Sequence, residues 1–106
     1  CSSQAGVSGS SSSFAYGSSK GAIHGLSMIL SQRLEEHGIR VHDVCPAAVE
    51  TPLKIAQLQE MKRHSGSETE YQEALRQLVP PHGIASIFAF LSSDEARYVR
   101  GSVFTC

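Results

Sequence analysis

A long apolar-faced helix followed at once by a strand is the feature that most constrains the fold of this chain. Between Phe14 and His37, apolar residues recur every three or four positions, which is the period of one buried helical face. Gly38 ends this helix as a C-terminal cap, and the β-branched stretch "IRVHDVC" (39–45) predicts a strand that Pro46 closes. A helix joined to a strand by so short a turn indicates a βαβ unit, and therefore a parallel sheet.

The residues around this unit predict a loop and two polar helices. The first 13 residues have no apolar period and predict a strand end followed by a Ser/Gly-rich loop. A helix is expected over residues 52–64, directly after Thr51, and the capping-box pair Ser67 and Glu70 opens another. Both helices carry many charges, so we expect them at the periphery.

Two apolar segments complete the pattern. The stretch "IASIFAFL" (84–91) predicts a helix that is too hydrophobic all round to lie on a surface, and "SVFTC" (102–106) predicts a last strand. With about three strands, a parallel sheet leaves edges and apolar faces uncovered. We therefore expect an α/β fold with a doubly wound, Rossmann-like parallel sheet, of which residues 1–106 form only the C-terminal part.

Charge and apolar content exclude several kinds of partner and location. The net charge of −1 and the pI near 6.6 provide no basic surface for nucleic acid. The longest apolar stretch, 84–91, is much shorter than a membrane span, and no signal peptide is recognisable. The three cysteines, Cys1, Cys45 and Cys106, form no C-x-x-C pair, so reduced thiols in a cytoplasmic protein are predicted.

The histidines do not predict a metal site. None of the five is placed in an H-x-x-x-H or H-E-x-x-H pattern, and no cysteine pair has a zinc-binding spacing. We therefore predict that the chain holds no metal. The histidines are His24, His37, His42, His64 and His82.

Tyr16 and Lys20 are candidates for acid/base chemistry. They stand four residues apart at the start of the predicted helix, so they are neighbours on its surface. A nearby ammonium favours the phenolate, which makes Tyr16 a possible general acid/base. Such a pair also arises by chance in roughly one protein in six of this size, so it needs support from other residues.

Ser3 and Thr51 provide that support, with alternatives open for each. Ser3 precedes Tyr16 by 13 residues and stands at the end of a predicted strand, where open α/β sheets place ligand-binding groups. Taken without further context, the preferred interpretation is a plain serine in a Ser-rich loop. Thr51 follows the next strand and either caps a helix or bonds a ligand amide.

Three ordered motifs resemble the short-chain dehydrogenase/reductase family across nearly the whole chain. "SSQAGVSGSSSSFAYGSSKGAIHGLS" resembles the family's active-site segment, with a serine 13 residues before the tyrosine of Y-x-x-x-K. "GIRVHDVCPAAVETPL" is similar to the family's G-I-R-V-N-x-V-x-P-G-x-V-x-T stretch. "FLSSDEARYVRGSVFTC" is similar to its late F-L-x-S-D-x-A-x-Y-x-x-G segment.

The resemblance implies a role for each site residue. Tyr16 would be the catalytic acid/base, Ser3 would orient the substrate carbonyl, and Lys20 would bind the nicotinamide ribose. The implied reaction is hydride transfer between NAD or NADP and an alcohol/carbonyl pair. The residues implied to lie beside the cofactor are Tyr16, Lys20, Pro46, Ala47, Val49 and Thr51.

The sequence also departs from the family pattern. The Gly-rich phosphate-binding turn is absent, no Asn is present, Ala47 replaces the usual Gly, and His42 stands where Asn is common. These departures leave a second hypothesis open, in which the chain is a non-catalytic fragment or assembly partner that cannot hold a cofactor alone. We therefore expect the isolated chain to be inactive.

The resemblance extends to the substrate loop and to assembly. Residues 51–79 correspond to the family's variable substrate loop, and the helix over 14–37 commonly packs against its copy in dimers and tetramers. Its stripe of glycines at Gly17, Gly21 and Gly25 suits that contact or, equally, a neighbouring helix of the same subunit. Neither the substrate nor the choice between NAD and NADP is predicted.

Overall fold

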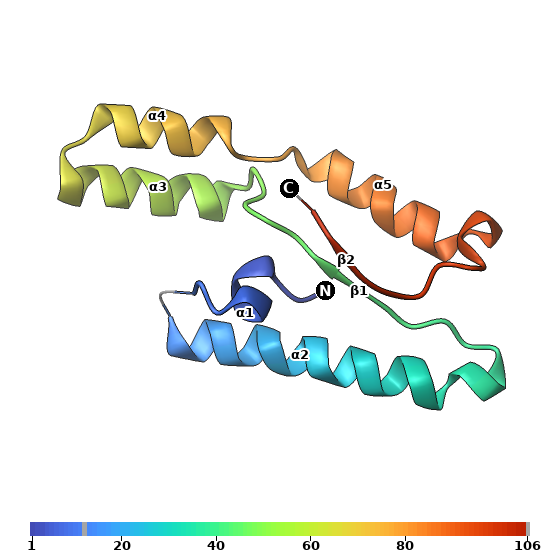
Figure 1. Cartoon of the computed structure of the whole chain (residues 1–106). Helices are drawn as coiled ribbons and strands as arrows, with labels where there is room; N and C mark the ends of the chain where they lie inside the picture. Colours follow the sequence, from blue (N-terminus) through green and yellow to red (C-terminus); the bar gives the residue numbers. More distant parts are fainter. Residues whose placement is uncertain (12, 106) are drawn as a thin grey trace.

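A two-stranded parallel sheet lies at the centre of the chain, with helices on both of its faces (Figure 1). The computed structural model describes residues 1–11 and 13–105, so Ser12 and Cys106 lie outside the described residues. Strands β1 (His42–Cys45) and β2 (Gly101–Phe104) run parallel, with helix α2 (Phe14–Arg33) on one side and helix α5 (Pro81–Ser92) on the other. The predicted α/β fold with a parallel sheet is confirmed.

The first residues pair with the free edge of β1, as the predicted strand end requires. The amide of Ser2 donates to the carbonyl of Val44 at 3.0 Å, and that of Gln4 donates to the carbonyl of Pro46 at 3.1 Å. The prediction of a loop after this segment is wrong in part, because helix α1 (Gln4–Ser8) forms there. This helix ends at Gly9, whose φ is 74°. Five residues are too few to show an apolar period, which is why the sequence did not predict this helix.

Helix α2 begins where the sequence predicts and ends one turn early. The Ser13 hydroxyl accepts a hydrogen bond from the amide of Tyr16 at 3.3 Å and so caps the N-terminus. After Arg33 the chain tightens into a 3-10 turn, η1 (Glu35–His37), before Gly38 adopts a φ of 70°. Helix ends often tighten in this way to satisfy their last carbonyls.

The two polar helices form a hairpin that extends from the end of β1 (Figure 1). Helices α3 (Pro52–Ser65) and α4 (Glu68–Arg76) start at the predicted caps, and Leu58 is their one buried residue. The other residues of both helices are not buried, which agrees with the peripheral position expected from their charges. A bridge returns the chain to the sheet, since the amide of Glu50 donates to the carbonyl of Val79 at 2.8 Å.

The apolar core lies between β1 and α5. Val44, Leu91 and Ala96, the last in the 3-10 turn η2 (Asp94–Ala96), form its buried centre. The prediction that residues 84–91 are buried all round is wrong, because Phe88 and Phe90 are 42% and 44% exposed. Only one side of α5 packs on the sheet, so its other side stays exposed. Among the described residues, no helix is long and apolar enough to span a bilayer.

Helix α1 packs against α2 through glycines. A Cβ added to Gly6 would lie 2.5 Å from the Cβ of Lys20, and one added to Gly21 would lie 3.3 Å from the carbonyl oxygen of Gly6. The stripe on α2 therefore admits a neighbouring backbone, as predicted, and within this chain that neighbour is α1. A Cβ at Gly25 would meet no atom within 4 Å.

We predict opposite effects for alanine at two of these glycines. Gly6→Ala forces α1 away from α2 and lowers the free energy of unfolding by about 1–3 kcal/mol, the usual cost of overpacking. Gly25→Ala, in open space on a helix, raises it by about 0.5–1 kcal/mol through helix propensity. Denaturant unfolding measures both, and an equal effect of the two variants would contradict the close packing of α1.

Candidate active site

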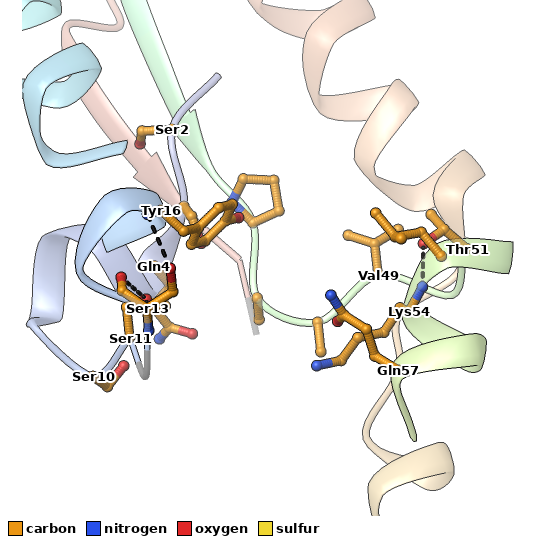
Figure 2. Close-up of a pocket in the computed structure, with 16 residues that line it drawn as sticks. Ser2, Gln4, Ser10, Ser11, Ser13, Tyr16, Val49, Thr51, Lys54 and Gln57 are labelled. Atoms are coloured by element: carbon orange, nitrogen blue, oxygen red, sulfur yellow. Dashed lines mark hydrogen bonds between the residues drawn. The ribbon is translucent and has the colours of Figure 1, made fainter. Parts of the chain in front are cut away.

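A cavity of about 740 Å³ opens at the carboxyl end of β1 (Figure 2). The starts of α1 and α2 form one wall, and the turn after β1 with the first turns of α3 forms the other. Ligands of open α/β folds bind at this end of the strands. Six of the seven predicted site residues line the cavity: Ser3, Tyr16, Pro46, Ala47, Val49 and Thr51.

Ser3 reaches the cavity because it ends the segment that pairs with β1. Its backbone is extended, with φ of −156° and ψ of 142°, and it directly precedes α1. The residue is 9% exposed, and its side chain makes no capping hydrogen bond to that helix. The hydroxyl of Ser3 is thus available to a ligand oxygen in the cavity.

Tyr16 and Lys20 are neighbours on the surface of α2, as their spacing predicts. Tyr16 lies in the first turn of α2 and is 47% exposed at the cavity. The Nζ atom of Lys20 lies 5.8 Å from the centre of its ring and donates to the carbonyl of Cys1 at 3.4 Å. Of the residues that the structure describes, Lys20 is the one predicted site residue outside the cavity lining.

The turn after β1 is held from both sides. The amide of Ala47 donates to the Thr105 hydroxyl at 3.1 Å, and Thr51 accepts from the amide of Lys54 at 3.2 Å. Thr51 therefore caps α3, one of its two expected roles. Because it also lines the cavity, its hydroxyl proton remains available for a ligand.

Comparisons with known proteins show which sequences this chain resembles. A family model described as enoyl-(acyl carrier protein) reductase matches residues 1–106. The chain is 37% identical to (+)-borneol dehydrogenase 2 of Salvia officinalis over 82% of its own length and 33% of the relative's. It is 38% identical to oxidoreductase UcpA of Salmonella typhimurium over 83% and 35%.

A solved structure shows the same fold. A short chain dehydrogenase family protein from Francisella tularensis superposes with a TM-score of 0.84 at 30% identity, over 97% of this chain and 46% of that one. The chain belongs to the short-chain dehydrogenase/reductase family. It spans about a third of the length of the curated relatives it matches.

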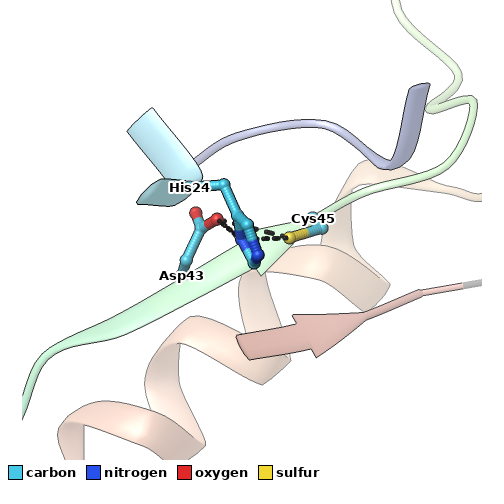
Figure 3. Close-up of side chains that lie close together, drawn as sticks. All are labelled: His24, Asp43 and Cys45. Atoms are coloured by element: carbon cyan, nitrogen blue, oxygen red, sulfur yellow. Dashed lines mark hydrogen bonds and ion pairs between the residues drawn. The ribbon is translucent and has the colours of Figure 1, made fainter. Parts of the chain in front are cut away.

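The chain also contains a polar cluster that the sequence did not predict (Figure 3). Asp43 and Cys45 of β1 lie buried against α2, where His24 Nδ1 is 3.0 Å from Asp43 Oδ2. Ser2 donates to Asp43 from its amide at 2.9 Å and from its hydroxyl at 2.5 Å. These residues are far apart in the sequence, so no motif spacing could reveal them, although an Asp inside a predicted strand was a signal.

The cluster shifts two pKa values in opposite directions. Burial alone would raise the pKa of Asp43, but hydrogen bonds from Ser2, His24 and Cys45 together hold it below its usual value. Burial raises the pKa of the Cys45 thiol, and the neighbouring Asp43 carboxylate raises it further against the opposing bond from Ser2. The carboxylate of Asp43 is therefore ionised at neutral pH, with the thiol of Cys45 as one of its donors.

We predict that the cluster contributes strongly to stability. Asp43→Asn removes the charge that accepts these bonds and lowers the free energy of unfolding by about 2–3 kcal/mol, since hydrogen bonds to charged groups contribute about 1.5–3 kcal/mol. The control is Glu60→Gln, because Glu60 pairs with Arg63 at 2.9 Å on an exposed face of α3 and contributes less than about 1 kcal/mol. Urea unfolding that gives similar losses for the two variants would contradict a structural role for Asp43.

Proposed function

We propose that the protein carrying this chain is a nicotinamide-dependent oxidoreductase that interconverts an alcohol and a carbonyl. The observation that carries the proposal is the convergence of Ser3 and Tyr16, from separate elements, on one cavity with the turn after β1. Two hydroxyls in one cavity can hold and protonate the same substrate oxygen. The family assigned above contains dehydrogenases and reductases, which supports this reaction class.

In the proposed mechanism the residues of this chain handle the proton. The phenolic oxygen of Tyr16 takes the hydroxyl proton of an alcohol as the carbonyl forms, and returns it to the substrate oxygen in the reverse direction. The Ser3 hydroxyl donates a hydrogen bond to that oxygen and orients it. Lys20 places its ammonium 5.8 Å from the centre of the Tyr16 ring, next to the group that transfers the proton.

The cavity fits the nicotinamide end of NAD or NADP. Pro46, Ala47 and Val49 provide an apolar wall, and Thr51 adds a hydroxyl donor on the same side. When bound, the nicotinamide supplies the hydride donor or acceptor. Two relatives of similar fold, each 26% identical, support such a cofactor: a short chain dehydrogenase from Mycobacterium paratuberculosis bound to NAD, and angucycline C-6 ketoreductase LanV with bound NADP.

Residues 51–79 are proposed to select the substrate. Leu53, Lys54 and Gln57, in the first turns of α3, line the cavity, and Figure 2 shows Lys54 and Gln57 across it from Tyr16. Their apolar, charged and amide side chains suit a small molecule that carries both an apolar part and a polar part.

Self-association through α2 is proposed for the whole protein. Leu26, Met28 and Ile29 on this helix are 55%, 54% and 52% exposed. Burying such side chains between two copies removes apolar area from water.

A cytoplasmic location, expected from the cysteines, stays a prediction.

We predict that Tyr16→Phe lowers kcat of the whole protein by about 10²- to 10⁴-fold, because general acid/base catalysis contributes about that factor. The ring and its packing are kept, so the circular dichroism spectrum should not change. The control is Tyr98→Phe, since Tyr98 is 85% exposed and lies outside the cavity lining. Turnover that survives Tyr16→Phe would remove Tyr16 from the mechanism.

A second prediction separates catalysis from the fragment hypothesis. Because the chain contains no Gly-rich phosphate-binding turn, the isolated 106 residues should bind NAD and NADP no more tightly than the micromolar range. Calorimetry on the isolated chain, with the whole protein as the positive control, measures this difference. Submicromolar binding by the isolated chain would show that the missing turn is dispensable.

A further inference from the structure

The polar cluster between α2 and β1 brings three different metal-ligand atoms together. His24 Nδ1, Asp43 Oδ2 and Cys45 Sγ all lie within 4.8 Å of one another (Figure 3). The separations are 3.0 Å from nitrogen to oxygen, 3.3 Å from sulfur to oxygen and 4.0 Å from sulfur to nitrogen. In a tetrahedral zinc site, ligand atoms about 2.0–2.3 Å from the metal lie about 3.3–3.8 Å from one another, so the observed separations bracket the required spacing.

Polar groups crowd around one oxygen of the cluster. The Ser2 hydroxyl, the His24 ring and the Cys45 thiol all lie within hydrogen-bond distance of Asp43 Oδ2, which has about two lone pairs. In the unoccupied cluster, the contact of 3.0 Å between Ser2 Oγ and Cys45 Sγ offers the thiol another partner. A cation relieves the crowding as well, because histidine and cysteine then direct lone pairs at the metal and donate no protons to the carboxylate.

Charge and surroundings also suit a divalent ion. A carboxylate, a thiolate and a neutral imidazole balance a charge of +2, so the occupied cluster leaves no net charge buried. The two hydrogen bonds from Ser2 orient the carboxylate as the outer partners of metal ligands do. The side chain of His24 is 20% exposed, which leaves a route for the ion to enter.

We propose that His24, Asp43 and Cys45 form a structural binding site for Zn²⁺ or a similar borderline-soft divalent ion. Nitrogen and thiolate ligands favour such ions over Mg²⁺ or Ca²⁺. A fourth ligand comes from water or from the Ser102 hydroxyl, which lies 3.3 Å from His24 Nδ1. Binding releases the thiol proton to solvent, requires the neutral imidazole to carry its proton on Nε2 so that Nδ1 presents a lone pair, and involves no redox step. This site departs from the sequence prediction of no metal, which rested on local spacings only.

Cobalt(II) titration of the chelator-treated, purified protein tests the site. We expect one equivalent of Co²⁺ to produce a thiolate-to-cobalt charge-transfer band in the near ultraviolet. Cys45→Ser abolishes the band, whereas Cys1→Ser, at an exposed thiol, retains it. Ser2→Ala weakens Co²⁺ binding by about 10- to 100-fold, the usual effect of removing an outer partner.

A measurement without variants guards against misfolding of the mutants. X-ray absorption of the zinc-loaded protein should show one sulfur at about 2.3 Å together with nitrogen or oxygen at about 2.0–2.2 Å. A shell without sulfur, a folded protein that gives no cobalt band, or a band that persists in Cys45→Ser would each overturn the proposal and leave a hydrogen-bonded network. None of these readouts depends on enzymatic activity, so failure of the metal site and failure of the proposed oxidoreductase are distinguishable.

Discussion

The pairing of the first four residues with β1 is the contact on which the site depends. Two backbone hydrogen bonds, from Ser2 to Val44 and from Gln4 to Pro46, tie this segment to β1 and to the residue that follows it. Ser3 lies between these two bonds and therefore beside the turn that follows β1. Without this pairing, Ser3 and Tyr16 would be linked only by the Ser-rich connection and by the packing of α1 on α2, and neither of these places Ser3 beside the turn after β1.

Strand β1 has two chemically different faces because successive side chains point to opposite sides. Val44 points to the apolar core under α5, whereas Asp43 and Cys45 point to α2. A buried carboxylate is costly unless its hydrogen bonds are satisfied, and Ser2 supplies two of them. The buried carboxylate of Asp43 therefore also holds Ser2, the residue next to Ser3, in place.

Local signals predicted much of the fold. The caps at Thr51 and Ser67 act within four residues, so the sequence alone located the starts of α3 and α4, and the apolar period located the start of α2. The end of α2 was predicted one turn too late, because the change to a 3-10 turn after Arg33 alters no apolar period. The exposure of α5 was mispredicted because composition reports how apolar a helix is and not how many faces a neighbouring sheet can cover.

The candidate site likewise has one part that local signals predict and another part that depends on packing. The family motifs contained Ser3, Tyr16 and Lys20, and the spacing of four residues sufficed to make the last two neighbours. His24 and Asp43 are 19 residues apart in the sequence and belong to different elements, so their contact exists only once α2 has packed on the sheet. Such a contact follows from register and helix rotation, which no local pattern contains. Because Ser2 bonds Asp43 while Ser3 lines the cavity, the residues that the motifs revealed depend for their position on residues that the motifs left out.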